Sequence, residues 1–397
     1  MPQTVPRPWL DPARALAPSL VRWRRHIHQH PELSFHEVET AQYIANELRL
    51  MGLEPQHILP NAVIAEVGDA GRGPTIALRA DIDALPISEE TGLPFASLTP
   101  GVMHACGHDG HTAILLGVAR LLADQRENIP GRIRLLFQPA EEIPPGGAEQ
   151  LIAAGVLNGV SAIAGLHLWS PLPSGTAAAI PGPAMAASDR FTITIQGRGG
   201  HGAMPHRCID ALETASRIVV ALQSIVSRSV DPLDAAVVTV GRFSSGTAFN
   251  VIAGEAVLEG TVRTLREEVR TLVRERLHTV VEHTAASASA RADIEYIEGD
   301  PAVQNDPGVT AIVADIAEEH LGGGAIRSGP PEMAAEDFAC YLQHVPGSFL
   351  LLGTANEHRH STFPHHHPQF TIDEDVMPVG VSILTETAYR LLERFAS

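Results

Sequence analysis

The feature that most constrains the fold is an alternation of short apolar segments with amphipathic helical ones. Within 110–123, for example, Ile114, Leu115, Val118 and Leu122 recur at the spacing of one helix face. Strands and helices that alternate along a chain are typical of an α/β fold with a mostly parallel sheet. The first part of the chain is predicted to form helices and strands, the helices at 11–28, 37–51, 110–123 and 148–154 and the strands at 63–67, 75–78, 133–137 and 162–166.

Residues 184–297 follow a different pattern. Strands are predicted at 190–196, 236–242, 256–263 and 292–297, and helices at 209–227 and 267–285. This order, βαββαβ, is typical of a ferredoxin-like α+β module. The α/β pattern then resumes with helices at 307–321, 334–344 and 373–394 and a strand at 348–352. We therefore expect a discontinuous α/β domain, formed by residues 1–183 and 298–397, with a ferredoxin-like domain inserted at 184–297.

Charge and composition exclude several classes of function. The chain has 28 basic and 46 acidic residues, a net charge of −18, which argues against nucleic-acid binding because phosphates require a basic surface. All 28 basic residues are arginine. Neither a lysine Schiff base nor a Walker phosphate loop is therefore available. Three cysteines in 397 residues are too few for a disulfide framework.

The beginning of the chain and its apolar runs indicate a soluble protein. The first residues, MPQTVPRPWLDPARAL, contain prolines and charges where a signal peptide needs an apolar run. The sequence has no stretch of about 18 uninterrupted apolar residues, so we expect no membrane span. We expect a cytoplasmic protein in a reducing compartment.

Four segments contain side chains suited to chemistry: Arg79–Pro86, Met103–Thr112, Gln138–Glu142 and Gly165–His167. Three of these segments lie at the ends of predicted strands. In open α/β sheets, ligands bind beyond the carboxyl ends of the strands. We therefore expect the segments to converge on one site.

The side chains in these segments are suited to binding a metal. Cys106 as a thiolate, His108 and His167 as neutral imidazoles, and a glutamate carboxylate are appropriate ligands for zinc or a neighbouring divalent ion. A thiolate or a carboxylate can bridge two ions about 3.5–4 Å apart. The adjacent Glu141 and Glu142 would allow one carboxylate to bind metal while the other takes a proton from metal-bound water.

Other catalytic motifs are absent from the sequence. His36-Glu37 begins like the zincin motif, but Thr40 stands where the second histidine should be, so we expect His36 at the surface. The chain has neither the signature of zinc deaminases nor the G-x-S-x-G elbow of α/β-hydrolases. Metal-assisted hydrolysis remains the chemistry that the residues favour.

Taken together, the segments resemble the M20 metallopeptidase family, specifically its amidohydrolase branch of hippurate hydrolases, N-acyl amino acid aminoacylases and auxin-conjugate hydrolases. The resemblance rests on MHACGHDGHT at 103–112, QPAEE at 138–142 and GLH at 165–167, and it extends from His28 to Pro368. It implies a catalytic α/β domain with an inserted lid or dimerisation domain. It also implies hydrolysis of the amide bond of an N-acyl amino acid or short peptide to a carboxylate and a free amino acid.

The resemblance further implies two divalent ions per chain, with zinc, manganese, cobalt and nickel all possible. Cys106 would bridge the two ions, and His108 and His167 would complete the ligands of one. Glu142 and a C-terminal histidine would complete the ligands of the other.

Two further roles follow from the same resemblance. The position of Pro368 selects His366 as the C-terminal ligand, with His365 and His367 left open as alternatives. Glu141 would be the general base, which removes a proton from the water between the ions and passes it to the leaving amine.

By resemblance, Asp83 would orient a ligating histidine. Three residues of the lid would contact the substrate. His201 would reach the site of a partner subunit and donate a hydrogen bond to the developing oxyanion. Asn250 and Arg263 would bind the substrate carboxylate, for which a planar guanidinium is suited. The resemblance thus implies a homodimer or homotetramer assembled through the lid.

The chain departs from the family pattern after the paired glutamates, where Ile143-Pro144-Pro145 precedes two glycines. This change removes no ligand, but the acyl group and the amino acid stay unassigned. A carboxypeptidase or dipeptidase that uses the same site is therefore an alternative. A non-catalytic metal- or ligand-binding protein is a second alternative, and the intact set of candidate catalytic groups argues against it.

Overall fold

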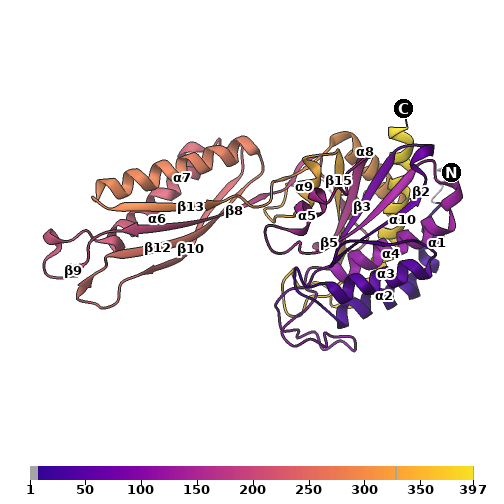
Figure 1. The fold of residues 1–397 in the computed structure, drawn as a ribbon, viewed down its shortest axis with the longest axis horizontal. Helices are drawn as coiled ribbons and strands as arrows, with labels where there is room; N and C mark the ends of the chain where they lie inside the picture. Colours follow the sequence, from indigo (N-terminus) through magenta and orange to yellow (C-terminus); the bar gives the residue numbers. More distant parts are fainter. Residues whose placement is uncertain (1–7, 327–328, 397) are drawn as a thin grey trace. The chain divides into compact units, whose positions relative to one another are not determined.

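The computed structural model describes residues 8–326 and 329–396, and the chain divides into two compact units (Figure 1). The first unit comprises Met1–Gly182, Gln304–Pro330 and Asp337–Ser397, and the second comprises Pro183–Val303 and Pro331–Glu336. Backbone hydrogen bonds explain why the short segment Pro331–Glu336 belongs to the second unit. The Glu332 N–H donates to the Ala184 carbonyl at 2.9 Å, and the Ala186 N–H donates to the Ala334 carbonyl at 2.9 Å.

A seven-stranded sheet forms the centre of the first unit. Its strands, in spatial order, are β1 (Gln56–Leu59), β2 (Ala62–Gly68), β4 (Arg132–Gln138), β3 (Thr75–Asp81), β5 (Val160–Pro173), β15 (Gly347–Ala355) and β6 (Ala177–Ala178). Strands β4, β3, β5 and β15 pair in parallel, and the outer strands pair antiparallel. The predicted α/β class, with a parallel sheet at its centre, is confirmed.

The helices that pack against the strands of this sheet are α3 (Val38–Leu50), α4 (His108–Asp124), α5 (Gly147–Ala153), α8 (Pro307–Leu321), α9 (Phe338–Leu342) and α10 (Met377–Phe395). Two further helices, α1 (Leu10–Ala15) and α2 (Ala17–Gln29), pack on α4 and α10. Helix α4 is almost entirely buried and packs against α2 and α10. A Cβ atom added to Gly117 would lie 2.6 Å from Val381 and 2.7 Å from Leu20, so these helices approach closely at that glycine. The close packing fixes the helix whose first residue is His108.

Two predicted helices differ from the structure. The predicted helix at 11–28 is two helices, because Pro18 lies in the first turn of α2 and starts a new helix after Leu16. The helix predicted at 334–344 is restricted to the five residues of α9. Ala334, which was predicted to lie in this helix, instead accepts the backbone hydrogen bond from Ala186 described above.

The second unit has the predicted ferredoxin-like order. Its elements are β8 (Ala187–Gln196), α6 (Ala211–Ser229), β10 (Ala236–Ser245), β12 (Glu255–Thr264), α7 (Glu267–Ser287) and β13 (Arg291–Ile297). The sheet order is β10-β12-β8-β13 with every pair antiparallel, and Figure 1 shows α6 and α7 lying along it. Short strands complete the structure: β7 (Gly182–Met185), β9 (Gly200–His201), β11 (Val251–Ile252) and β14 (Val303–Asn305). Among the described residues, no helix is both long and apolar enough to cross a membrane.

Candidate metal centre

The four segments selected from the sequence converge at one edge of the seven-stranded sheet. Asp81 ends β3 and Gln138 ends β4, and the two residues are partners in the parallel register. His167 lies on the neighbouring strand β5, and His108 begins α4. The carboxyl ends of parallel strands meet at one edge, and this geometry brings residues that are far apart in the sequence together.

Five side chains form two overlapping groups of potential metal ligands. The ligand atoms of Cys106, His108 and His167 all lie within 4.8 Å of one another, and so do those of Cys106, Glu142 and His366. We call these the first and the second ligand group. Cys106 belongs to both groups, and its Sγ atom lies 3.6 Å from Nε2 of His167. This arrangement offers two adjacent positions for a cation on either side of one sulfur.

Buried polar atoms that lack hydrogen-bond partners show that the donors fit a cation. Nε2 of His108 and Oε1 of Glu142 are both buried without a hydrogen-bond partner, and they lie 3.8 Å apart. Leaving such atoms unsatisfied costs free energy that a bound cation would recover. Burial alone would lower the pKa of His108, but Asp81, Asp83 and Glu142 outweigh it and raise that pKa to about 10. The negative surroundings of this imidazole therefore favour positive charge.

Asp83 fixes the orientation of His108 and of the loop that carries Glu142. The His108 Nδ1–H donates to the Asp83 carbonyl at 2.9 Å and faces Oδ1 at 3.2 Å, which turns Nε2 toward the ligand groups. Oδ2 of Asp83 accepts hydrogen bonds from the Ser34 hydroxyl at 2.7 Å and the Glu142 backbone N–H at 3.1 Å. Burial raises the pKa of Asp83, but these bonds outweigh burial and hold it below its ordinary value. The contact to the Glu142 backbone could not be read from the sequence.

The peptide group of Leu168 organises three imidazoles. Its carbonyl accepts a hydrogen bond from Nδ1–H of His167 at 2.9 Å and from Nε2–H of His365 at 3.0 Å. Its N–H donates to Nε2 of His111 at 2.8 Å. The bond to the carbonyl leaves Nε2 of His167 without a hydrogen and facing Cys106, and burial keeps the pKa of His167 well below its ordinary value. A backbone contact of this kind has no signal in the sequence.

Asp81 and His111 are engaged in hydrogen bonds rather than left available as ligands. Because Nε2 of His111 accepts from Leu168, its Nδ1 carries the hydrogen and donates to Oδ1 of Asp81 at 2.7 Å. Oδ2 of Asp81 accepts from Nη1 of Arg79 at 2.6 Å. Their ligand atoms do lie within 4.8 Å of that of His108. The bonds that already satisfy them favour a supporting role.

The three consecutive C-terminal histidines have different surroundings. Nε2 of His366 lies 3.3 Å from Oε1 of Glu142, and its ring completes the second ligand group. Its backbone has a φ of 64°, and its N–H donates to the Ala105 carbonyl at 2.8 Å, beside Cys106. This backbone bond places the residue next to the ligands.

The neighbours of His366 point elsewhere. Nε2–H of His365 donates to Leu168, and Nδ1 of His365 lies 3.2 Å from the Ser170 hydroxyl, so both ring nitrogens have partners. Nδ1 of His367 accepts from the Gln369 backbone N–H at 3.0 Å. Neither ring belongs to a potential ligand group of the described residues.

Glu141 lies beside both ligand groups. Its Oε2 atom lies 4.0 Å from Nε2 of His108, and its ligand atom lies within 4.8 Å of those of His108 and Glu142. Burial, Glu142 and Glu141 together raise the pKa of the Cys106 thiol. The carboxylate of Glu141 therefore adjoins the candidate cation positions without being one of the five ligands.

The three candidate residues of the second unit do not all lie together. His201 in β9 pairs with Val251 in β11, and the Asn250 carbonyl accepts from the Gly202 N–H at 2.9 Å, so His201 and Asn250 are neighbours. His201 and Asn250 thus lie near the start of β12, which follows β11 in the chain, whereas Arg263 lies near the end of β12. It is eight residues beyond Glu255, roughly 26 Å along a strand. Arg263 is half-buried, whereas His201 and Asn250 are exposed.

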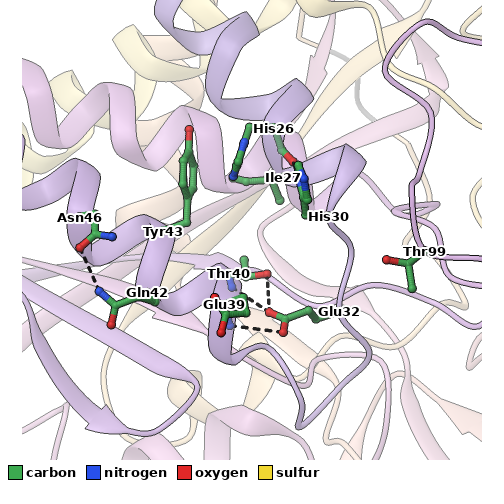
Figure 2. A pocket seen from close by; sticks show the side chains of 10 residues that line it. All are labelled: His26, Ile27, His30, Glu32, Glu39, Thr40, Gln42, Tyr43, Asn46 and Thr99. Atoms are coloured by element: carbon green, nitrogen blue, oxygen red, sulfur yellow. Dashed lines mark hydrogen bonds between the residues drawn. The ribbon is translucent and has the colours of Figure 1, made fainter.

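A separate cavity lies between helices α2 and α3 (Figure 2). Its lining residues are His26, Ile27, His30, Glu32, Glu39, Thr40, Gln42, Tyr43, Asn46 and Thr99. None of the five candidate ligands is among them. The Glu32 carboxylate in this cavity is bound by the backbone N–H of Thr40 at 2.7 Å and its hydroxyl at 2.8 Å. This cavity is therefore distinct from the candidate metal centre.

Comparisons with known proteins relate the chain to metal-dependent hydrolases. The sequence model of peptidase family M20/M25/M40 matches residues 77–390. An N-acetyl-L-cysteine deacetylase from Bacillus subtilis is 46% identical over 379 residues, which are 95% of this chain and 89% of the relative. An N-acyl-L-amino acid amidohydrolase from Geobacillus stearothermophilus is 50% identical over 293 residues, 71% of this chain and 79% of the relative.

A solved structure with a similar fold is that of the Bacillus subtilis YXEP protein, described as a dinuclear metal binding peptidase from the M20 family. It is 41% identical to this chain, with a TM-score of 0.84. The match covers 96% of this chain and 99% of that one. The likeness thus includes both units.

Proposed function

Because the chain belongs to peptidase family M20/M25/M40, whose members are metal-dependent hydrolases, we propose that it cleaves the amide bond of N-acyl amino acids. The products would be a carboxylate and a free amino acid. The observation that carries the proposal is the pair of ligand groups that share Cys106, together with Nε2 of His108 and Oε1 of Glu142, which are buried, make no hydrogen bond and lie 3.8 Å apart. The names of two relatives, a deacetylase and an N-acyl amino acid amidohydrolase, support the substrate class.

We propose that this chain holds two divalent cations. Cys106, His108 and His167 would bind one, and Cys106, Glu142 and His366 would bind the other. Zinc, manganese, cobalt and nickel are all compatible with this mixture of sulfur, imidazole and carboxylate donors. When bound, such ions polarise a carbonyl group and lower the pKa of water.

The protein's own residues would move the protons. Glu141 would take a proton from the attacking water, which the distance of 4.0 Å between its Oε2 and Nε2 of the candidate ligand His108 supports. The same carboxyl group would then deliver that proton to the leaving amine. Asp83 would keep Nε2 of His108 directed at the cation, because it accepts the hydrogen of Nδ1.

Residues of the second unit would recognise the substrate. Nδ1 of His201 accepts from the Ala203 N–H at 3.1 Å, which leaves the hydrogen on Nε2 available for a developing oxyanion. Arg263 and the partner subunit's Asn250, which neighbours His201 in the same chain, would bind the substrate carboxylate. His201 pairs with Val251, which lies just before the start of β12, whereas Arg263 lies near the end of β12, so one small substrate cannot reach both within one chain. We therefore propose a homodimer or homotetramer in which the partner subunit's His201 completes each site.

A substrate panel tests the proposed function. The purified protein would be loaded with zinc, manganese, cobalt or nickel and offered N-acetyl amino acids, N-benzoyl amino acids and unblocked dipeptides. We expect metal-dependent release of free amino acid from the N-acyl compounds. Turnover of dipeptides alone would indicate a dipeptidase, and no turnover with any metal would contradict a catalytic role.

A further inference from the structure

The buried carboxylate of Glu37 lies under the loop that presents Glu141. Glu37 is fully buried, immediately before helix α3. Its Oε1 atom accepts hydrogen bonds from the backbone N–H of Ala140 at 2.7 Å and of Phe35 at 3.0 Å. Its Oε2 atom accepts from the Asn61 side-chain amide at 2.8 Å. This one side chain therefore links the start of α3 to the residue before the proposed general base.

The backbone that Glu37 contacts adopts a conformation that residues with a side chain rarely populate. Ala140 has a φ of 51° and Phe35 has a φ of 71°, both in the left-handed region. Neither residue is glycine, so surrounding contacts must hold each conformation in place. Oε1 of Glu37 binds the N–H of both residues. A single carboxylate oxygen thus binds the backbone of both Ala140 and Phe35.

The loop is fixed on both sides of Glu141. Before it, the Ala140 N–H is bound by Glu37 and the Ala140 carbonyl accepts from the Gly147 N–H at 2.9 Å. After it, the Glu142 N–H is bound by Asp83 at 3.1 Å. A change in φ at Ala140 would rotate the direction in which the next side chain leaves the backbone. The hydrogen bond from Ala140 to Glu37 is thus one of three that hold the backbone on either side of Glu141.

We propose that Glu37 is a positioning residue for Glu141, which it aims at the metal centre by holding Ala140 in the left-handed conformation. The proposal rests on the proposed function for the role of Glu141 in catalysis. The geometric part stands by itself, because it concerns only the backbone of Ala140 and the direction of the adjacent side chain. A misplacement of about 1 Å at a reacting group can reduce turnover on the order of 100-fold.

A matched control is available in Glu32, which precedes the same helix. Glu32 also binds backbone at the start of α3, through Thr40 at 2.7 Å and Glu39 at 3.3 Å, as Figure 2 shows. Its carboxylate makes no hydrogen bond to the Ala140–Glu142 loop. A Glu32→Ala variant therefore removes a comparable contact from α3 without touching the loop of Glu141. It separates an effect on helix stability from an effect on positioning.

The test compares kcat, KM, bound metal and melting temperature of Glu37→Ala, Glu37→Gln and Glu32→Ala. We expect Glu37→Ala to lower kcat about 10- to 100-fold while KM and two ions per chain are retained. Glu37→Gln should recover most of that loss, because its amide oxygen can still accept from Ala140 and Phe35. Glu32→Ala should lower only the melting temperature. Equal losses of kcat in Glu37→Ala and Glu32→Ala, or none in Glu37→Ala, would overturn the proposal.

A crystal structure of the Glu37 variant supplies a readout that needs no substrate. We expect φ of Ala140 to become negative in Glu37→Ala, or in Glu37→Met if the first variant does not fold, because neither side chain can accept from the Ala140 N–H, and we expect Glu141 to turn away from His108. A left-handed Ala140 with Glu141 still about 4 Å from His108 would refute the positioning role. Failure of the wild-type protein to cleave N-acyl amino acids would count against the proposed function alone.

Discussion

The sulfur of Cys106 lies 3.6 Å from Nε2 of His167, on the side of the ring that carries no hydrogen. The Leu168 carbonyl takes the hydrogen of Nδ1, so the imidazole meets the sulfur with a lone pair rather than with a donor. The Cys106 thiol can donate its hydrogen to this lone pair, and once a cation displaces that hydrogen the thiolate and Nε2 can both bind the cation. The same sulfur belongs to the second ligand group as well.

Replacement of Cys106 should therefore disturb both proposed ions. We expect Cys106→Ala to weaken binding of both, each by on the order of 100-fold or more, since loss of a supporting group alone costs 10- to 100-fold. Metal analysis after dialysis measures the effect. Cys208→Ala is the matched control, because Cys208 lies in the second unit and contacts the Met204 carbonyl. Two tightly bound ions in Cys106→Ala would show that the sulfur is not a shared ligand.

Glu141→Gln should separate metal binding from catalysis. The amide keeps the size of the carboxylate but cannot take a proton, so we expect kcat to fall by about 10²–10⁴ while both ions remain bound. Glu149→Gln, an exposed change on α5, serves as the control. If Glu141→Gln kept wild-type turnover, the general base would have to be another residue.

The three C-terminal histidines can be told apart by metal content. His366→Ala should lose the ion of the second ligand group and leave one ion per chain. His367→Ala should keep both ions, because that ring stacks on Phe363 at 4.7 Å and binds the Gln369 backbone. Its expected cost is about 0.5–1.5 kcal/mol of stability. A lost ion in His367→Ala but not in His366→Ala would reverse the assignment.

Asp83→Asn should weaken metal binding through His108. The amide nitrogen would face a donor, either His108 Nδ1–H or the Glu142 N–H, where the carboxylate now accepts from both. We expect a 10- to 100-fold loss of metal affinity, roughly the effect of removing other residues that orient ligands. Calorimetric titration of the metal-free variant with zinc measures it. Unchanged affinity would mean that the Asp83 backbone carbonyl alone orients the imidazole.

Glu37 should make stability depend on pH between about 4.5 and 7. Burial raises its pKa from 4.5 to about 7 in the folded protein. Over this interval the folded state keeps a proton that the unfolded state has lost, so stability falls as pH rises. Above pH 7, the raised pKa of Glu37 should lower the free energy of unfolding by about 3 kcal/mol. Denaturant unfolding measures the free energy of unfolding of the wild type and of Glu37→Gln at pH 5 and at pH 8. From pH 5 to pH 8, this free energy should fall more in the wild type than in Glu37→Gln. A difference independent of pH would contradict the raised pKa.

The sequence indicated the fold class because its cores are built from long periodic segments. The spacing of apolar residues along the sequence predicted both the apolar face of α4 and the βαββαβ order of the second unit. Strands of two to four residues, such as β6 and β7, were not predicted, since so few residues carry no periodic pattern. The shortened α9 was missed because backbone pairing of Ala334 with Ala186, within the range predicted as helix, competes with helix formation.

For the site, residue types were more predictable than contacts. A cysteine, histidines and glutamates at strand ends pointed to a metal, and the fold places Cys106, His108 and Glu142 together. The peptide group of Leu168 could not be found this way, because any residue supplies the same N–H and carbonyl. In the sequence, Glu37 follows His36 as in a zincin motif, but the second histidine of that motif is missing. Its link to Ala140 depends on tertiary structure alone.

Anomalous diffraction from crystals soaked in zinc, recorded on both sides of the zinc absorption edge, tests whether Cys106 bridges two ions. We expect two peaks per chain, each about 2.3 Å from the sulfur of Cys106. One should also contact His108 and His167, and the other Glu142 and His366. A single peak, or peaks that do not touch Cys106, would contradict a dinuclear centre bridged by this residue.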